Sequence, residues 1–172
     1  MHETSPQLAP HHVRGTFELI DHNGREVNRR TYRGKHVVVF FGFTHCKGVC
    51  PQALSRLSAV LDRLGPRAER IHPLYVTVDP LRDTPAVMKE FLASAYPRFT
   101  GLTGSTQQIE WAKRSFRVFS TGVSDHGEPG GYRMPHAAFT YVLGPDGTYL
   151  THFSDAVEEE VLTAALFSIV DE

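Results

Sequence analysis

The sequence has few cysteines, no long hydrophobic run and no excess of charge of either sign. Its 172 residues include only two cysteines, and its 18 Lys and Arg residues are balanced by 19 Asp and Glu residues. A membrane-spanning helix needs about 20 consecutive apolar residues, and a balanced surface gives no electrostatic footprint for nucleic acid. Met1 to Arg14 also lacks the apolar core of a signal peptide. We therefore expect a soluble domain that does not bind nucleic acid.

Both cysteines lie at a junction between a predicted strand and a predicted helix. The β-branched and aromatic run 37–41 indicates a buried strand, and Pro51 suits the first turn of the helix that follows. In a helical turn, Cys46 and Cys50 come to one face with Cβ atoms roughly 5–6 Å apart. That spacing allows a disulfide after a modest adjustment, or allows two thiolates to hold one soft metal ion. The helix N-terminus and Lys47 favour the thiolate, so we expect at least one unusually acidic cysteine.

The rest of the chain alternates strand and helix patterns in an order that indicates the fold. Periodicity, turn residues and capping motifs predict an N-terminal hairpin (15–27), a central strand (37–41), a helix (51–64), a strand (71–78), a helix (85–92), a loop (101–104), a helix (105–115), a strand (117–121), an exposed loop or hairpin (122–133), a hairpin (137–143 with 148–153) and a C-terminal helix (157–169). This order is typical of an α/β thioredoxin-like sandwich with an extra N-terminal β-hairpin and an inserted loop or hairpin before the strand led by His136. We expect residues 1–14 to form a flexible leader and residues 15–172 a single domain.

Two further segments are expected beside the cysteine loop. Sites in open α/β sheets form at the carboxyl ends of the strands, where the loop with Asp79, Arg82 and Asp83 also begins. These three side chains either tune the thiols and offer a docking surface, or form an ion-paired loop in which Asp83 or Thr84 caps the next helix. His136 stands at the entrance to another strand of the same sheet, which favours its interpretation as a ligand.

A site of two thiolates and one imidazole suits copper. Such a compact, soft ligand set holds Cu(I) in a trigonal arrangement and accepts Cu(II) with added ligands. Zinc is the competing metal, but a structural zinc site usually has four protein ligands, and the chain has no second cysteine pair. The residue types therefore favour copper over zinc.

The sequence resembles the Sco/SenC family, the thioredoxin-like copper proteins of cytochrome c oxidase assembly. The motifs that carry the resemblance follow one another over most of the chain: Gly15-Thr16-Phe17, Phe41 to Cys46, Cys50-Pro51, Thr77 to Pro85, Gly101 to Gly104, His136, and Leu143 to Gly147. The resemblance implies that Cys46, Cys50 and His136 bind one copper, as Cu(I) or Cu(II). It also implies delivery of copper to the dinuclear copper site in subunit II of the oxidase, or reduction of the thiols of that site.

The resemblance further implies a location and a set of partners. Family members are periplasmic or intermembrane-space domains tethered by one N-terminal membrane segment. We therefore expect this domain at the periplasmic face of the inner membrane, with the anchor outside the given sequence. The expected partners are subunit II of cytochrome c oxidase and other periplasmic copper donors or thiol reductants. We expect the protein to be a monomer.

Two positions depart from the family pattern. Between the cysteines the family often has Pro-Asp, whereas this chain has Lys47-Gly48, which replaces a negative charge with a positive one. That change is expected to lower the pKa values of the thiols and to weaken attraction for the metal cation. The residue before His136 is often Asp but here is Pro135, so a carboxylate that could orient the imidazole is missing. Met134 is a candidate extra ligand, with core packing as the alternative.

Functions of different classes would use the same residues. The leading hypothesis is a copper metallochaperone rather than a classical enzyme. The alternative is a thiol-disulfide oxidoreductase in which Cys46 attacks and Cys50 resolves. Such enzymes usually have two residues between their cysteines, and the three here favour metal binding. A peroxidase would want Thr or Ser where Phe43 stands, and a redox or copper sensor would share all of these residues.

Overall fold

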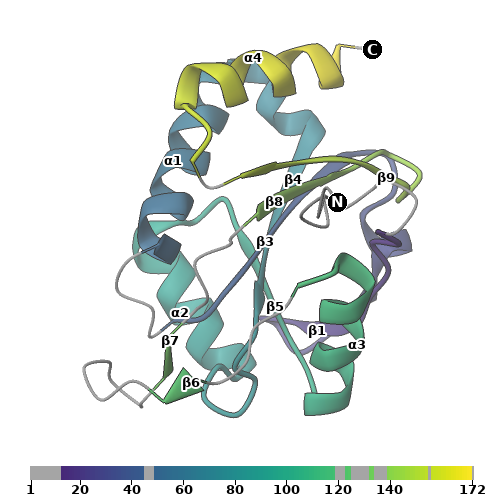
Figure 1. Cartoon of the computed structure of the whole chain (residues 1–172), viewed down its shortest axis with the longest axis vertical. Helices are drawn as coiled ribbons and strands as arrows, with labels where there is room; N and C mark the ends of the chain where they lie inside the picture. The colour runs from purple at the N-terminus through teal and green to yellow at the C-terminus, as the bar shows by residue number, and fades with distance from the viewer. Residues whose placement is uncertain are drawn as a thin grey trace, which may run out of the picture.

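A seven-stranded mixed sheet organises the chain. The computed structural model describes residues 13–44, 49–118, 123–124, 132–133, 139–154 and 156–171. The sheet has the strand order β2-β1-β5-β4-β3-β8-β9, in which β3, β4 and β5 are parallel and both β1 and β8 join them antiparallel (Figure 1). Its strands are β1 (Glu18–Asp21), β2 (Glu26–Asn28), β3 (His36–Gly42), β4 (Ile71–Thr77), β5 (Thr100–Thr103), β8 (Phe139–Leu143) and β9 (Tyr149–Ser154).

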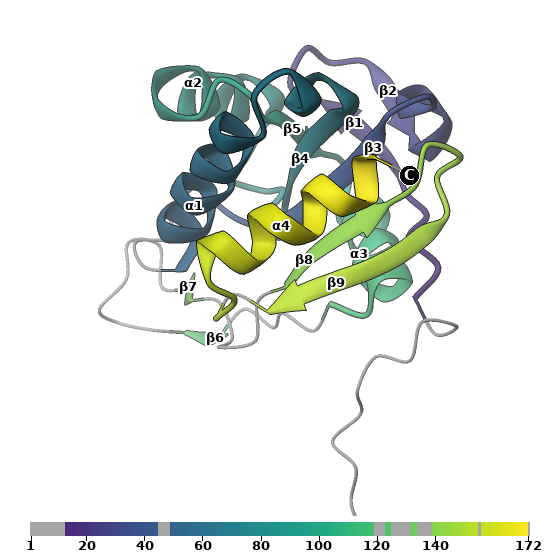
Figure 2. The ribbon, with the colours of Figure 1, turned by 90° about the horizontal axis from the view of Figure 1, so that it is seen from above.

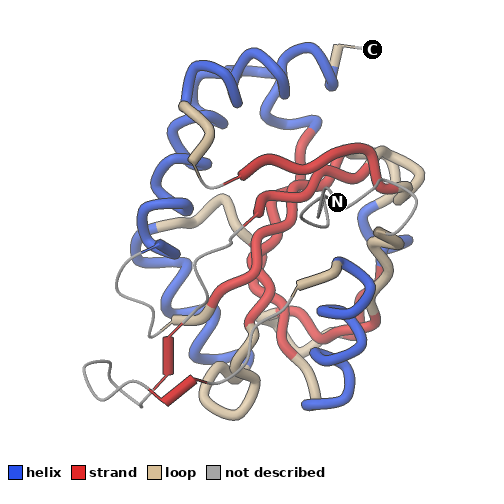
Figure 3. The backbone as a smooth tube through the Cα atoms, in the orientation of Figure 1, coloured by secondary structure: helices blue, strands red, loops and turns tan. Residues whose placement is uncertain are grey.

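Helices cover both faces of this sheet, so that two apolar cores form. Helices α1 (Val49–Leu64), α2 (Pro85–Ala95) and α4 (Glu159–Val170) supply Leu57, Met88 and Leu162 to one core. Helix α3 (Thr106–Phe116) supplies Ile109 and Phe116 to the other. Figures 2 and 3 show the sheet between these layers. The arrangement confirms the thioredoxin-like α/β sandwich predicted from the order of the elements.

The central strand β3 is buried on both sides because it lies between the two layers. Val38 and Phe40 belong to the core with α1, whereas Val37, Val39 and Phe41 belong to the core with α3. Successive residues of a strand face opposite sides of the sheet, so a doubly covered strand needs an unbroken apolar run. The prediction of a buried central strand is therefore confirmed.

Short-range sequence signals also match the structure. Thr84 caps α2 by accepting a hydrogen bond from the N–H of Val87. Ser105 and Gln108 form the predicted reciprocal capping box at the start of α3. The N-terminal hairpin is present as β1 paired with β2, with an Asx turn in which Asp21 accepts from the N–H groups of Asn23 and Arg25. All of these features depend on residues a few positions apart, which is why the sequence revealed them.

Two predicted elements are corrected. Residues 101–104 were expected to form a loop, but Thr100–Thr103 is β5, placed between β4 and β1. Gly101 and Gly104 give the segment the character of a turn, although threonine favours strands, and pairing with both β4 and β1 stabilises the strand. Residues 117–121 were expected to form a strand, yet Arg117 has a left-handed conformation with φ of 60° and ends α3. Residues 119–121 lie outside the described part of the chain.

The segments around the sheet complete the architecture. Within the predicted inserted loop or hairpin, β6 (Val123–Ser124) pairs antiparallel with β7 (Tyr132–Arg133). At the start of the chain, Val13 is buried and the N–H of Arg14 donates to the carbonyl of Ser115. Of the predicted leader, residues 1–14, only Val13 and Arg14 are among the described residues. Among the helices that the structure describes, none has both the length and the apolar character needed to cross a membrane.

Candidate functional site

The structure describes the strands and the helix next to the predicted ligands, but not the ligand side chains themselves. Cys46 and His136 fall outside the described residues, and Cys50 is placed as the second residue of α1 without its side chain. Within the described ranges, no three His, Cys, Asp or Glu side chains gather as a metal site. The three predicted ligand side chains are not among those described, so the assignment of Cys46, Cys50 and His136 stays a prediction. The framework that carries them is described in detail.

The strand before the cysteine loop ends in register with its parallel neighbour. Gly42, the last residue of β3, pairs with Thr77, the last residue of β4. The N–H of Val78 then donates to the carbonyl of Gly42 over 2.8 Å. The loops that follow the two strands therefore leave the sheet side by side, as was predicted for the cysteine loop and the Asp79 loop.

A buried aspartate ties these two loops together. The side chain of Asp83 has no solvent exposure (0%). Its Oδ2 accepts from the backbone N–H of Thr44 at 3.0 Å and from Oγ1 of Thr77 at 2.7 Å, and its Oδ1 accepts from Oγ1 of Thr44 at 2.5 Å. A buried carboxylate is tolerated only when donors satisfy its oxygens, so these groups stabilise one arrangement. The chain is thereby fixed two residues before Cys46.

Asp79 and Arg82 form the ion pair that the sequence allowed. Nε of Arg82 donates to Oδ2 of Asp79, and both side chains are largely buried. The Arg82 guanidinium lies 5.9 Å from the ring centroid of Phe43, which follows β3 directly. Of the two predicted caps of α2, Asp83 and Thr84, the structure selects Thr84, and the Asp83 side chain turns inward instead. The ion-paired loop is therefore observed, and Asp83 joins the two loops through Thr44 and Thr77.

Sequence reasoning missed Thr44 and Thr77 as the partners of Asp83. Thr77 is the last residue of β4 and Thr44 lies two residues after β3, where a donor in an apolar surrounding needs an acceptor. That position is a weak signal, since a threonine is common in strands for packing reasons alone. Only the spatial adjacency of β3 and β4 reveals that one carboxylate serves both.

The strand that follows His136 enters the sheet at the same edge. Strand β8 runs antiparallel to β3, with Thr140 opposite Phe40, so β8 begins where β3 ends. Phe139, its first residue, packs edge-on against the His152 ring with centroids 5.2 Å apart. Burial lowers the pKa of His152, which favours its neutral form at neutral pH. His136 precedes β8 by three residues, so the entry of β8 agrees with the expected neighbourhood.

Comparison with known proteins agrees with this architecture. The family model described as SCO1/SenC matches residues 5–171. An SCO2-like protein of Rickettsia felis is 38% identical over 151 residues, which cover 87% of this chain and 74% of that protein.

Solved structures give the same result. Arabidopsis thaliana ScoI with copper bound has a TM-score of 0.85 at 28% identity, covering 92% of this chain and 98% of that one. Bradyrhizobium japonicum ScoI with copper bound has a TM-score of 0.80 at 36% identity, covering 91% of this chain and 99% of that one. Sequence, fold and relatives agree, and the chain belongs to the SCO1/SenC family.

Proposed function

We propose that this protein is a copper metallochaperone that helps assemble the dinuclear copper site in subunit II of cytochrome c oxidase. It binds one copper, as Cu(I) or Cu(II), through Cys46, Cys50 and His136. It acts as a monomer at the periplasmic face of the inner membrane, where copper donors and thiol reductants supply it. Two structures of the same family, from Arabidopsis thaliana and Bradyrhizobium japonicum, are described as copper-bound, which supports the choice of metal.

The observation that carries the proposal is the convergence of three chain segments at one edge of the sheet. Thr44 follows β3, Cys50 stands in the first turn of α1, and β8 starts at Phe139 beside β3. An extended chain spans at most about 3.6 Å per residue, so Cys46, two residues after Thr44, can lie at most about 7 Å from it. His136, three residues before Phe139, can lie at most about 11 Å from it. These reaches support the proposal, since they allow both predicted ligands to meet near the helix that carries Cys50.

The chemistry of the ligand set supports transfer of copper as cargo. Two thiolates and an imidazole suit a soft ion, and three ligands leave a position open for a ligand of the acceptor. The Asp83 network fixes the start of the cysteine loop. Fixing this start reduces the entropy that the loop loses when its thiolates close on the metal. Lys47 and Pro135 are expected to lower the affinity relative to chains that have an acidic residue at those positions.

A second candidate function is a thiol-disulfide oxidoreductase, which the position of Cys50 in the first turn of α1 favours. A helix N-terminus stabilises a thiolate, and reduction of a partner disulfide requires one. In this reaction, the Cys46 thiolate attacks a disulfide of the partner and releases one partner thiolate. Cys50 then attacks the mixed disulfide and releases the second, so two electrons pass to the partner and a Cys46–Cys50 disulfide remains. A redox or copper sensor would use the same change without a client.

An anaerobic titration of the reduced protein with Cu(I) against a chromophoric chelator tests the primary proposal. We expect one equivalent to bind, and we expect at least tenfold weaker binding, about 1.4 kcal/mol, in each of Cys46→Ala, Cys50→Ala and His136→Ala. Met134→Leu tests the candidate extra ligand, and binding as tight as in the parent would assign Met134 to packing. Unchanged affinity in His136→Ala would reject the three-ligand site.

The oxidised protein separates the two candidate functions. A chaperone that binds through thiolates loses its copper affinity when Cys46 and Cys50 form a disulfide, and it regains that affinity on reduction. An oxidoreductase instead reduces a model disulfide to a dithiol in the absence of copper. In Cys50→Ala, the mixed disulfide between Cys46 and the substrate then accumulates. Rapid turnover with such a substrate, together with weak Cu(I) binding, would make the reductase the primary function.

A further inference from the structure

A strongly basic segment lies on the side of the molecule away from the candidate copper site. Residues 25–35 contain five of the 18 Lys and Arg residues of the chain and a single acidic residue, Glu26. The segment includes β2 and the short 3-10 helix Arg29–Tyr32. In both views of the ribbon it lies opposite the first turn of α1 (Figures 1 and 2).

The cations of this basic segment are not used in ion pairs that the structure describes. In the described part of the chain, ion pairs involve other cations, such as Arg63 with Glu159 and Arg67 with Asp171. None involves the cations of the basic segment, namely Arg25, Arg29, Arg30, Arg33 and Lys35. All but Arg29 are exposed. Arg29 is partly covered because its stem packs near Gly147 in the turn between β8 and β9.

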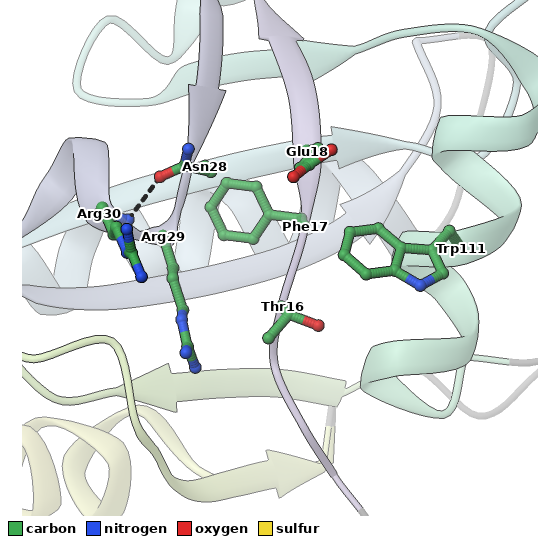
Figure 4. A pocket seen from close by; sticks show the side chains of 7 residues that line it. All are labelled: Thr16, Phe17, Glu18, Asn28, Arg29, Arg30 and Trp111. Atoms are coloured by element: carbon green, nitrogen blue, oxygen red, sulfur yellow. Dashed lines mark hydrogen bonds between the residues drawn. The ribbon is translucent and has the colours of Figure 1, made fainter.

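A hollow with a volume of about 290 Å³ joins this segment to α3. Its lining residues are Thr16, Phe17, Glu18, Asn28, Arg29, Arg30 and Trp111. Figure 4 shows Arg29 and Arg30 on one side of Phe17 and Trp111 on the other. Phe17 is buried, and the side chain of Asn28 is occupied in accepting from the N–H of Arg30 at 2.8 Å.

Trp111 is a large apolar side chain that lies exposed on the surface of α3. It is the single tryptophan of the chain, and 46% of its surface is accessible to solvent. Arg114 follows it on the same face of α3, one turn further along, and is exposed. A tryptophan flanked by arginines, here arginines without an ion partner among the described residues, is typical of the boundary between lipid headgroups and acyl chains. There the indole is half buried and the guanidinium groups meet phosphates.

The nearby acidic groups reduce this positive charge without cancelling it. Glu18 lines the hollow against two arginines, and Glu26 is exposed on β2. The carboxylate of Asp21 is buried and satisfied by two backbone N–H groups of its own turn. Asp146 lies near Arg29 and accepts from the N–H of Thr148. The basic segment therefore keeps a net positive charge.

We propose that the basic segment, the hollow and Trp111 together bind the anionic headgroup surface of a lipid bilayer. Phosphate groups of the lipids contact Arg29, Arg30 and Arg33, and the indole of Trp111 enters the interface. Contact on this side leaves the edge that carries Cys50 facing away from the membrane, so the candidate copper site stays accessible. An acceptor protein seated on the basic segment would not reach that edge, which is why the charge is assigned to a membrane. The inference does not depend on copper binding.

Vesicle binding of the full chain tests the inference, with Trp111 as an intrinsic reporter. The probe is phosphatidylcholine vesicles with about one third phosphatidylglycerol, compared with pure phosphatidylcholine vesicles. We expect cosedimentation and a blue shift of the Trp111 emission with the anionic vesicles only. At about 0.1 M salt the binding should be clear, and at about 0.5 M salt it should largely disappear because the charges are screened.

Two double variants make the test specific. Arg30→Gln with Arg33→Gln removes two exposed charges of the basic segment, and we expect about thirtyfold weaker partition, since each cation contributes about fivefold near an anionic bilayer. Arg63→Gln with Arg67→Gln removes the same net charge from the ion-paired side and should bind as the parent does. Equal losses in both double variants, or no binding to anionic vesicles, would overturn the proposal. A Trp111 shift with polyglutamate but not with vesicles would overturn it in favour of an acidic protein partner.

Discussion

The carboxyl and amino edges of the parallel strands are held by different chemistry. At the carboxyl edge, one buried carboxylate, Asp83, accepts from Thr44 and Thr77. At the amino edge, Nε2 of His72 lies 2.9 Å from Oγ1 of Thr100, and the ring of Tyr32 lies 4.4 Å from the His72 ring. The first edge is joined by a charge-bearing acceptor, and the second by neutral polar and aromatic groups.

The difference shows which edge is built to hold a loop in place. Hydrogen bonds to a carboxylate are stronger than neutral ones, and removing their acceptor leaves buried donors without a partner. The carboxyl edge therefore fixes the chain that leads to Cys46. At the amino edge, burial and Lys35 lower the pKa of His72, and burial raises the pKa of Tyr32, so both rings stay neutral at neutral pH. That edge is stabilised by packing and responds to acid.

Asp83→Asn should have the largest effect on stability. The amide presents an NH2 group where the carboxylate accepts, so at least one buried donor loses its acceptor, and we expect a loss of about 3 kcal/mol in the free energy of unfolding. Urea denaturation measures it. Asp146→Asn is the control at the amino edge, because this exposed aspartate accepts from the N–H of Thr148 in its own turn and joins no second loop among the described residues. A comparable loss in both variants would remove the distinction between the two edges.

Thr77→Val should have the next largest effect. The substitution keeps the shape but removes the hydroxyl that donates to Asp83 and accepts from the N–H of Asp79, so we expect a loss of about 1–2 kcal/mol. Combined with Thr44→Val in a double-mutant cycle, it should show coupling of about 1 kcal/mol, since both hydroxyls share one carboxylate. Thr100→Val is the matched variant at the amino edge, where the hydroxyl bonds to the uncharged His72 ring instead of a carboxylate. Strict additivity of the Thr44 and Thr77 losses would contradict the shared network.

Acid should weaken the amino edge through His72. The pKa of this side chain is below its ordinary value of 6.5, mainly because burial disfavours the imidazolium ion, and Lys35 adds repulsion. The unfolded chain therefore takes up a proton at a higher pH than the folded chain does. The contribution of His72 is complete above its unfolded pKa and is lost as pH falls through the lower folded pKa.

The comparison of two proteins isolates this effect from other histidines. We expect the parent to lose more stability than His72→Gln when denaturation is measured at about pH 7 and at about pH 5. An identical pH dependence in the two proteins would mean that His72 is equally easy to protonate in the folded and unfolded chains.

The smallest expected effect concerns Asp146 in the turn beside the amino edge. Its pKa is lowered first by the backbone and side-chain hydrogen bonds of Thr148, with a minor contribution from Arg29. Titration of the carboxyl carbon by NMR should therefore give a pKa below 3.8 in the parent and a slight rise in Arg29→Gln. A larger rise than the removal of one exposed charge allows would indicate that Arg29 also holds the turn conformation.

The parts of the fold that the sequence revealed are those that depend on local chemistry. The capping box at Ser105, the cap at Thr84 and the turn at Asp21 each join residues within four positions of one another. The apolar run of β3 predicted a strand covered on both faces because a singly covered strand would alternate. The short strand β5 was missed because Gly101 and Gly104 indicate a loop, and only pairing with β4 and β1 makes the segment between them a strand.

The sequence identified some residues of the candidate site and missed the role of others. Residue type and spacing identified Cys46 and Cys50 as a pair, and the resemblance to a family added His136. The role of Asp83 was not predictable, since an aspartate before a threonine and a proline normally indicates a helix cap. Its true partners lie 39 residues and six residues away.

The sequence by itself determined most of the strand and helix order, the turn and cap positions and the chemistry available for copper, because each depends on neighbouring residues or on composition. The tertiary structure alone decided which loops meet, and so made Asp83 a bridge between β3 and β4 and joined Arg29, Arg30 and Trp111 around one hollow. The physical reason is that hydrogen bonds and charges act over a few ångströms, and only folding sets which distant residues come within that range.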